Sequence, residues 1–214
     1  VTLGNNAGRK TYAVISDMDQ PLGFAVGNAL EVKEAIDTLQ GRGPADFWEL
    51  CMTLGSYMLL AGGKAENEKE ARCKLTESVK NGRSLDKLAQ LIEAQGGDKT
   101  AVYHPELLPA AAYQEDILSP QEGYISHIAC SEIGMCSLLL GGGRETKESA
   151  IDLSVGLVLR KKVGDYVKKD EVLAVLHGND RDKMAQARER FLRAYSFSGN
   201  TVEKTPLIKG VITP

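Results

Sequence analysis

The spacing of apolar residues divides the chain into two parts. Up to about residue 100, apolar residues recur every three or four positions, which is the period of an amphipathic helix. From Ala112 onward they gather in short runs rich in β-branched and aromatic residues, as strands do. We therefore expect an α/β chain with a mainly helical first part and a β-rich second part.

The first part is predicted to contain one strand and four helices. Thr11–Ser16 is a short apolar run of β-forming residues and is expected to be a buried strand. Four amphipathic stretches follow it, at 27–39, 44–61, 67–80 and 85–94. Pro44 suits the first turn of the second helix, and Ser84 is a preferred N-cap for the fourth.

The second of these helices has the clearest apolar face. Residues at helical spacing along this face are all apolar: Phe47, Leu50, Cys51, Leu54, Met58 and Ala61. Such a stripe is typical of a helix that packs against a hydrophobic core.

The second part is predicted to consist mainly of strands. Runs of β-forming residues lie at 113–118, 124–129, 156–160, 172–176 and 207–213. Helices are expected over 132–140 and 181–195. The turn Ser119–Gly123 marks the start of a second module. The predicted organisation is a first domain at 1–117, a β-rich module at 118–198, and a C-terminal tail at 199–214 that returns to the first part.

The segment Lys161–Leu173 has the pattern of the hairpin in lipoyl and biotinyl carrier domains. Gly164-Asp165 suits a tight turn, and the flanking residues alternate as half-buried strands do. This pattern predicts a module of the barrel-sandwich or hammerhead type. A carrier also needs a modifiable lysine at an exposed tip, usually beside methionine, and the sequence has no Met-Lys-Met motif. A carrier function is therefore disfavoured.

The composition excludes several classes of function. Of the 214 residues, 43% are apolar, which is enough for a buried core. A net charge of −3 argues against a nucleic-acid partner, which requires clustered Lys and Arg. No apolar run reaches the roughly 20 residues that span a bilayer. The cysteines have no Cys-x-x-Cys spacing, so we expect reduced thiols in a cytoplasmic protein: Cys51, Cys73, Cys130 and Cys136.

Histidines and glycines offer two further candidates for chemistry. His104, His127 and His177 do not lie at metal-ligand spacing, and we expect no catalytic role for them. The run Gly141–Gly143, followed by Arg144 and Lys147, could present backbone N–H groups to a phosphate. It lacks the Walker pattern, and a helix end followed by a loop explains it better.

Three carboxylates lie close to a predicted turn at Gln20–Gly23. They are Asp17, Asp19 and Glu34. Paired carboxylates can serve acid–base chemistry or bind a cation. The structural alternative is that the two aspartates cap or solvate the turn while Glu34 lies on an exposed helix face.

Several motifs together resemble those of the pyrimidine-nucleoside and thymidine phosphorylase family. The most specific are Gly8–Thr11, Ile15–Met18, Gln20–Gly23 and Gly27–Val32. Further stretches fit the same pattern, namely Gln95–Asp98, Lys147–Leu157 and Lys161–Asp165. The resemblance covers nearly the whole chain.

The resemblance implies the C-terminal half of a homodimeric enzyme with a small helical domain and a large α/β domain. Such an enzyme cleaves uridine, thymidine or deoxyuridine with phosphate, giving the free base and a ribose or deoxyribose 1-phosphate. The family's phosphate loop and pyrimidine-binding residues precede the matching region. The resemblance therefore implies no catalytic or substrate-binding residue here, and we expect this segment alone to be inactive.

The resemblance also implies half of a potassium site. The matching positions are Leu22 and Ala25, through their backbone carbonyls, and Glu34, through its carboxylate. A weakly hydrated cation prefers several carbonyl oxygens and few charges. The other ligands would come from the family's phosphate loop. Glu34 can contribute only if the helix that begins near Gly27 brings its carboxylate back to the turn.

One alternative stays open at this point. The chain could be a non-catalytic binding or interaction module that keeps the fold for another purpose. The sequence upstream of Val1 in the parent gene would distinguish the two interpretations.

Overall fold

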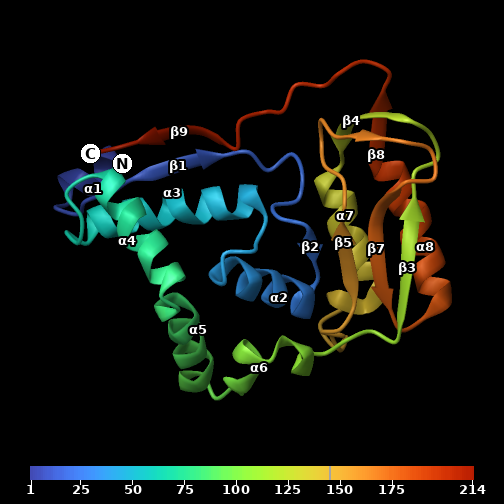
Figure 1. Cartoon of the computed structure of the whole chain (residues 1–214), viewed down its shortest axis with the longest axis horizontal. Coiled ribbons are helices and arrows are strands. Elements are labelled where there is room, and N and C mark those ends of the chain that lie inside the picture. The colour runs from blue at the N-terminus through green and yellow to red at the C-terminus, as the bar shows by residue number, and fades with distance from the viewer. Residues whose placement is uncertain (145) are drawn as a thin grey trace. The chain divides into compact units, whose positions relative to one another are not determined.

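The computed structural model describes residues 1–144 and 146–214 and has a mixed α/β fold, which confirms the predicted fold class. The described residues form two compact units (Figure 1). Unit 1 contains Val1–Asp17, Ile36–Tyr103 and Thr205–Pro214, and unit 2 contains Met18–Ala35 and His104–Lys204. Unit 1 is mainly helical, whereas unit 2 holds most of the strands.

The two units divide the chain differently from the predicted boundary at residue 117. Met18–Ala35 groups with unit 2 although it lies early in the sequence. α2 (Asn28–Leu39) therefore begins in unit 2 and ends in unit 1. The assignment of domains to 1–117 and 118–198 stays a prediction.

Unit 1 combines a two-stranded sheet with helices. β1 (Ala13–Ser16) pairs antiparallel with β9 (Ile208–Ile212), so strands far apart in the sequence lie side by side (Figure 1). The other elements of this unit are α1 (Thr2–Asn6), α3 (Ala45–Ala61), α4 (Glu68–Lys80), α5 (Arg83–Ala94) and α6 (Thr100–Tyr103).

A charged network fixes α4 against α3. Arg72 on α4 donates to the two carboxylate oxygens of Glu49 at 2.7 and 3.1 Å, and to the hydroxyl of Thr53 at 2.9 Å. Glu68 accepts a further bond from Nε of Arg72 at 3.0 Å. The bond from Arg72 holds the pKa of the Glu49 carboxyl below its ordinary value. Polar side chains therefore form part of the contact between α3 and α4, and Gly55 of α3 lies against Leu75 of α4 beside them.

The α3 face predicted to pack on a core is not covered in this structure. Cys51, Leu54 and Met58 on that face are exposed. The buried residues of α3 are instead Met52, Thr53 and Ser56. The helix itself is confirmed, but the prediction of a buried apolar face is wrong for these three residues, because the polar side of α3 makes the contact with α4.

One predicted helix start is also wrong. α5 begins at Arg83, directly after Gly82, whose φ of +80° separates it from α4. Ser84 is therefore inside the helix and is not its N-cap. Its hydroxyl lies 2.7 Å from that of Ser78 on α4. The left-handed glycine sets the break between the helices, because few other residues adopt that conformation without strain.

Unit 2 contains two antiparallel sheets. One has the strand order β2-β5-β7-β3 and the other the order β6-β4-β8. The first sheet consists of β2 (Ala25–Val26), β5 (Gly156–Leu159), β7 (Val172–Gly178) and β3 (Tyr113–Leu118). The second consists of β6 (Tyr166–Val167), β4 (Gly123–Ile128) and β8 (Tyr195–Ser198).

Helices complete unit 2, and its core lies among the sheets and the two longer helices (Figure 1). The helices of unit 2 are η1 (Pro105–Leu107), α7 (Cys130–Ser137), a π-helical turn η2 (Leu138–Gly142) and α8 (Arg181–Ala194). Fully buried side chains come from strands and helices alike, and include Ile117, Ile125, Ile133, Leu157, Leu176 and Phe191. No described helix has both the length and the apolar character needed to cross a membrane.

The segment Lys161–Leu173 connects β5 to β7, which pair antiparallel, and the N–H of Arg160 donates to the Leu173 carbonyl at 2.7 Å. β6 pairs with β4, whereas β7 pairs with β3 and β5, so the two strands belong to different sheets. The tight turn at Gly164 is present, with φ at +86°. The local alternation of residues indicated strands correctly: β7 pairs with β5 across this segment, whereas β6 pairs with the more distant β4.

Candidate cation site at the turn before β2

The turn that precedes β2 is built around a glycine. Gly23 has a φ of +66°, in the left-handed region that glycine adopts without strain. A Cβ atom at this position would lie 2.1 Å from Oε2 of Glu34. Only a residue without a side chain therefore lets the Glu34 carboxylate lie against the turn.

Glu34 reaches back from α2 and holds the turn. Its Oε1 accepts the N–H of Phe24 at 2.9 Å and the N–H of Ala25 at 3.0 Å. Hydrogen bonds to an ionised carboxylate are about twice as strong as neutral ones. The sequence left open whether α2 brings Glu34 to the turn, and the structure shows that it does.

The backbone of Ala25 faces Glu34. β2 is an edge strand, and the Phe24 carbonyl accepts the N–H of Leu159 on β5 at 2.8 Å. In an antiparallel ladder the next residue directs its N–H and C=O to the opposite side. The N–H of Ala25 accordingly points to Glu34. Leu22 lies earlier in the turn, and its side chain is exposed.

A buried lysine also holds this turn. Lys162 is only 8% exposed, and its Nζ donates to the Gly23 carbonyl at 2.9 Å and lies 5.6 Å from the ring centre of Phe24. Next to it, the N–H of Val163 donates to Oε1 of Gln20 at 3.0 Å. Sequence reasoning missed this role, because a lysine in a Lys-Lys pair beside a glycine turn is usually exposed.

The donor atoms at the turn suit a particular class of ion. Among the described residues, no group of three or more His, Cys, Asp or Glu side chains is placed to hold a metal ion. A site at the turn would use one carboxylate, that of Glu34, and backbone carbonyls. This donor set fits a weakly hydrated monovalent cation better than zinc, which prefers nitrogen and sulfur ligands.

Comparisons with known proteins match both parts of the chain to one family. Residues 1–85 match the family described as glycosyl transferase family, a/b domain, and residues 124–198 match the pyrimidine nucleoside phosphorylase C-terminal domain. The pyrimidine-nucleoside phosphorylase of Bacillus subtilis is 56% identical over 179 residues, which are 84% of this chain and 41% of that protein. The pyrimidine-nucleoside phosphorylase of Geobacillus stearothermophilus is 48% identical over 208 residues, which are 97% of this chain and 48% of that protein.

The chain belongs to the pyrimidine-nucleoside phosphorylase family. It spans about half the length of the curated relatives it matches. The turn at Gly23 lies in the part that matches the glycosyl transferase a/b domain, whereas Lys162 lies in the part that matches the phosphorylase C-terminal domain. The bond between Nζ of Lys162 and the Gly23 carbonyl therefore joins the two matched domains of this phosphorylase-family chain.

The histidines of this family member have ordinary surroundings. His104 is exposed, with its Nδ1 3.1 Å from Oε1 of Glu106, and His127 is an exposed residue of β4. His177 is half-buried on β7, and burial, followed by the charges of Lys33 and Arg160, lowers its pKa. Within the part of the chain that the structure describes, the three histidines are not grouped with other Cys, Asp or Glu side chains into a metal site.

The glycine run of the phosphorylase-family chain forms the end of a helix. Gly141 adopts a φ of +103° inside the π-helical turn η2, and the Gly142 carbonyl accepts from Nδ2 of Asn28 at 3.0 Å. Arg144 and Lys147 are both exposed. The structure thus gives the predicted helix end, and the less favoured alternative of a phosphate-binding loop is not tested by it.

The two aspartates near the turn have different surroundings. The carboxylate of Asp17 lies 3.3 Å from Nζ of Lys209, which precedes Gly210 in β9. Asp19 is exposed in unit 2, near enough to the Cys130 thiol to raise its pKa, although burial is the larger cause. Glu34 binds the turn by accepting the backbone N–H groups of Phe24 and Ala25.

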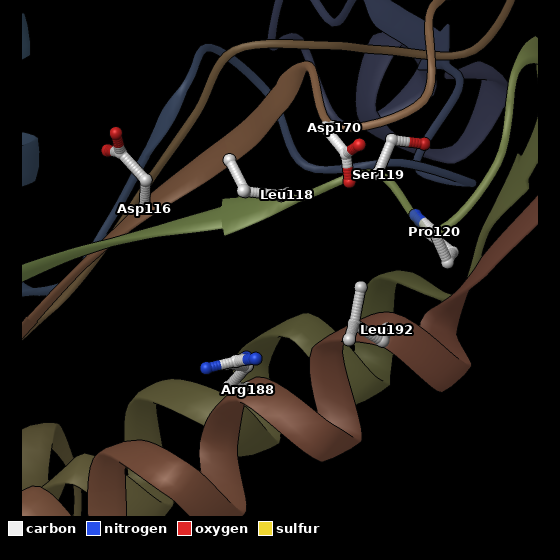
Figure 2. Close-up of a pocket in the computed structure, with 7 residues that line it drawn as sticks. All are labelled: Asp116, Leu118, Ser119, Pro120, Asp170, Arg188 and Leu192. Carbon is white, nitrogen blue, oxygen red and sulfur yellow. The ribbon is translucent and has the colours of Figure 1, made fainter.

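A separate pocket of about 340 Å³ lies between β3 and α8 (Figure 2). Its charged side chains are Asp116, Asp170 and Arg188, and all three are exposed. Arg188 already pairs with Glu115 at 2.9 Å. The buried lining residue Ser119 already donates its hydroxyl to the Gln121 carbonyl at 2.6 Å. The resemblance to the phosphorylase family assigns no role to this pocket.

Proposed function

We propose that the whole protein is a pyrimidine-nucleoside phosphorylase that acts on uridine, thymidine or deoxyuridine. In this reaction a phosphate oxygen forms a bond to C1′ of the sugar while the bond from C1′ to the pyrimidine nitrogen breaks. The base leaves as the protonated, neutral pyrimidine, and the sugar becomes a 1-phosphate. The observation that carries the proposal is 48% identity to a phosphorylase of that name over 97% of the chain.

We propose further that these 214 residues do not catalyse the reaction alone. Catalysis requires positioned cations and hydrogen-bond donors around the phosphate and the departing base. The resemblance assigns those groups to the other part of the family's sequence. From the resemblance we also propose that the whole enzyme is a cytoplasmic homodimer.

The role proposed for this chain is to supply half of a potassium site. The carbonyls of Leu22 and Ala25 and the carboxylate of Glu34 would hold the ion, and the phosphate-binding loop would supply the other ligands. The ion would contribute positive charge and a fixed position for that loop. Two contacts support the proposal, because Glu34 lies against the turn and the Ala25 backbone faces it.

A hybrid enzyme tests the proposed activity. This chain replaces the matching region of the Geobacillus stearothermophilus phosphorylase, and release of uracil from uridine is measured with and without phosphate. We expect phosphate-dependent release by the hybrid and none by the 214-residue chain. A folded hybrid without activity would contradict the proposed reaction. Activity of the 214-residue chain alone would contradict the proposal that catalysis requires the other part of the enzyme.

The same hybrid tests the potassium site through Glu34→Gln. The substitution removes the negative charge and keeps the size of the side chain, so we expect the potassium concentration for half-maximal activity to rise about tenfold, equivalent to 1.4 kcal/mol. The apparent KM for phosphate should rise as well. Glu31→Gln is the matched control, because Glu31 lies on the same helix and its Oε1 accepts the Gly27 N–H at 3.0 Å. Equal responses of the two variants would show that Glu34 is not a ligand.

A further inference from the structure

β3 has one row of backbone groups that faces away from its sheet. It lies at the edge of the four-stranded sheet of unit 2, next to β7. The Arg160 N–H donates to the Leu173 carbonyl, so alternate residues of β7 from Leu173 onward bond to β5, and those between them bond to β3. Glu115 pairs with one of these, Leu176, so the next residue, Asp116, directs its N–H and C=O to the open edge. An extended peptide can add a further strand at such an edge.

The two sides of this edge differ in character. Glu115 points to α8, because one of its carboxylate oxygens accepts from Nη1 of Arg188 at 2.9 Å. Side chains alternate along a strand, so Asp116 points away from α8, as Figure 2 shows. On the other side, Leu192 is directed from α8 into the gap beside β3 (Figure 2). The edge is therefore acidic on one side and has an apolar side chain on the other.

The pocket beside β3 keeps two negative charges. Asp116 and Asp170 line it, and within the described residues neither carboxylate takes part in an ion pair. Arg188 adds no net charge to this count, because it pairs with Glu115. The Asp170 N–H donates to the Ser119 carbonyl at 2.9 Å, which holds Asp170 near the end of β3. Lysine and arginine side chains complement carboxylates placed in this way.

The form of the pocket favours a peptide over a small molecule. Leu118 in its lining is 44% exposed, and the charged lining residues are exposed as well. Ligand pockets usually bury most of a small molecule, which so open a site does not do. A peptide strand gains main-chain hydrogen bonds along the edge in addition to its contacts in the pocket.

The charges of β3 argue against a second copy of this chain as the occupant. If β3 paired antiparallel with itself, Glu115 and Asp116 would lie beside the same two carboxylates of the other copy. Like charges at neighbouring positions of two strands destabilise the pairing. The edge therefore suits a basic strand better than its own acidic one.

We propose that the edge of β3 binds an extended peptide of another protein in which basic and β-branched residues alternate. The side chains of the added strand alternate between the two sides of the sheet. Its basic residues lie on the side of Asp116 and reach Asp170, and its apolar residues lie on the side of Leu192. The proposal does not depend on phosphorolysis, because these residues are separate from the proposed potassium site.

Two synthetic peptides of equal composition test the proposal on the unaltered 214-residue chain. The first is Thr-Lys-Val-Lys-Val-Lys-Thr, and the second is Thr-Lys-Lys-Val-Val-Lys-Thr, which has the same charge without the alternation. Fluorescence anisotropy measures the binding of each labelled peptide. We expect the alternating peptide to bind at least about tenfold more tightly. Equal affinities, or no binding of the alternating peptide, overturn the proposal.

Methylation of peptide nitrogens tests the addition of a strand. In a β-strand, alternate residues direct their N–H groups to the same neighbour, so the lysines and the valines of the alternating peptide face opposite edges. N-methylation at two lysines or at both valines removes one of these sets of donors. We expect one set to weaken binding about tenfold or more and the other to have little effect. Equal effects of the two sets overturn the proposal.

Substitutions in the chain locate the contact. Asp116→Asn combined with Asp170→Asn keeps the size of both side chains and removes both charges, so binding of the alternating peptide should weaken about tenfold or more. Asp182→Asn combined with Glu203→Gln is the matched control, because it removes two charges from exposed residues of the same unit outside the pocket. Circular dichroism compares the folding of the two variants. Equal affinities of the two folded variants overturn the proposal.

The oligomeric state of the chain tests the competing occupant. Analytical ultracentrifugation compares the chain with the Asp116→Asn and Asp170→Asn double variant in the absence of peptide. We expect the same sedimentation for both. If the chain forms a dimer that this double variant strengthens, β3 pairs with a second copy and the proposal is overturned.

Discussion

At the scale of single residues, the turn before β2 depends on three residues whose properties are complementary. Gly23 supplies a left-handed backbone and empty space, Glu34 fills that space with a carboxylate, and Lys162 binds the Gly23 carbonyl. The family resemblance indicated Glu34 from its position in the sequence. It could not indicate Lys162, whose partner lies 139 residues away in the chain.

Gly23→Ala tests the fit between the turn and Glu34. The new Cβ would meet Oε2 of Glu34 and would also strain the backbone, so we expect the free energy of unfolding to fall by about 2–4 kcal/mol. Gly141→Ala is the control in the same unit, because its φ is also positive and its nearest neighbour is Cβ of Asp152 at 3.8 Å. That variant should lose about 1 kcal/mol. Urea unfolding measures both, and equal losses would contradict a specific contact with Glu34.

At the scale of secondary-structure elements, the α3–α4 pair combines the Arg72 network with packing of Leu75 against Gly55. Arg72 binds Glu49 and Thr53 on the side of α3 that is buried. Hydrophobic periodicity predicts that a helix exists and which side is apolar. It does not predict which side finds a partner within a given chain, and for α3 the apolar side is exposed.

The Arg72 network should make unit 1 sensitive to acid. The pKa of Glu49 is lowered in the folded state, so its ionised form contributes stability above the ordinary value of 4.5, and that contribution is lost as the pH falls through the folded pKa. Arg72→Met removes the main cause of the lowered pKa. We therefore expect the midpoint of thermal unfolding to fall less between pH 7 and pH 3 in this variant than in the original protein.

Arg83→Met is the control for that measurement, because Arg83 is exposed and contacts Asn81 only among the described hydrogen bonds. It should keep the full response to acid. An identical pH response in the Arg72 and Arg83 variants would show that the Glu49 carboxylate does not stabilise the folded state through Arg72.

At the scale of the whole molecule, sequence patterns predicted most elements and few of their partners. β3 (Tyr113–Leu118) and α4 (Glu68–Lys80) lie where periodicity and capping residues placed them. The short strand β2 carries too few residues for a period and was not predicted. The pairing of β6 with β4, instead of with β7, is also beyond local pattern, because it is decided by packing between distant segments.

The pairing of β1 with β9 has a consequence for how the protein is made. Ala13 pairs with Ile212, and ribosomes add about 5–20 residues per second, so β1 leaves the ribosome roughly 10–40 seconds before its partner strand exists. Unit 2 lies almost wholly between these two strands in the order of synthesis and can fold first. During that interval the apolar β1 has an open edge that other nascent chains could pair with. Completion of unit 1 thus waits until β9 has been synthesised.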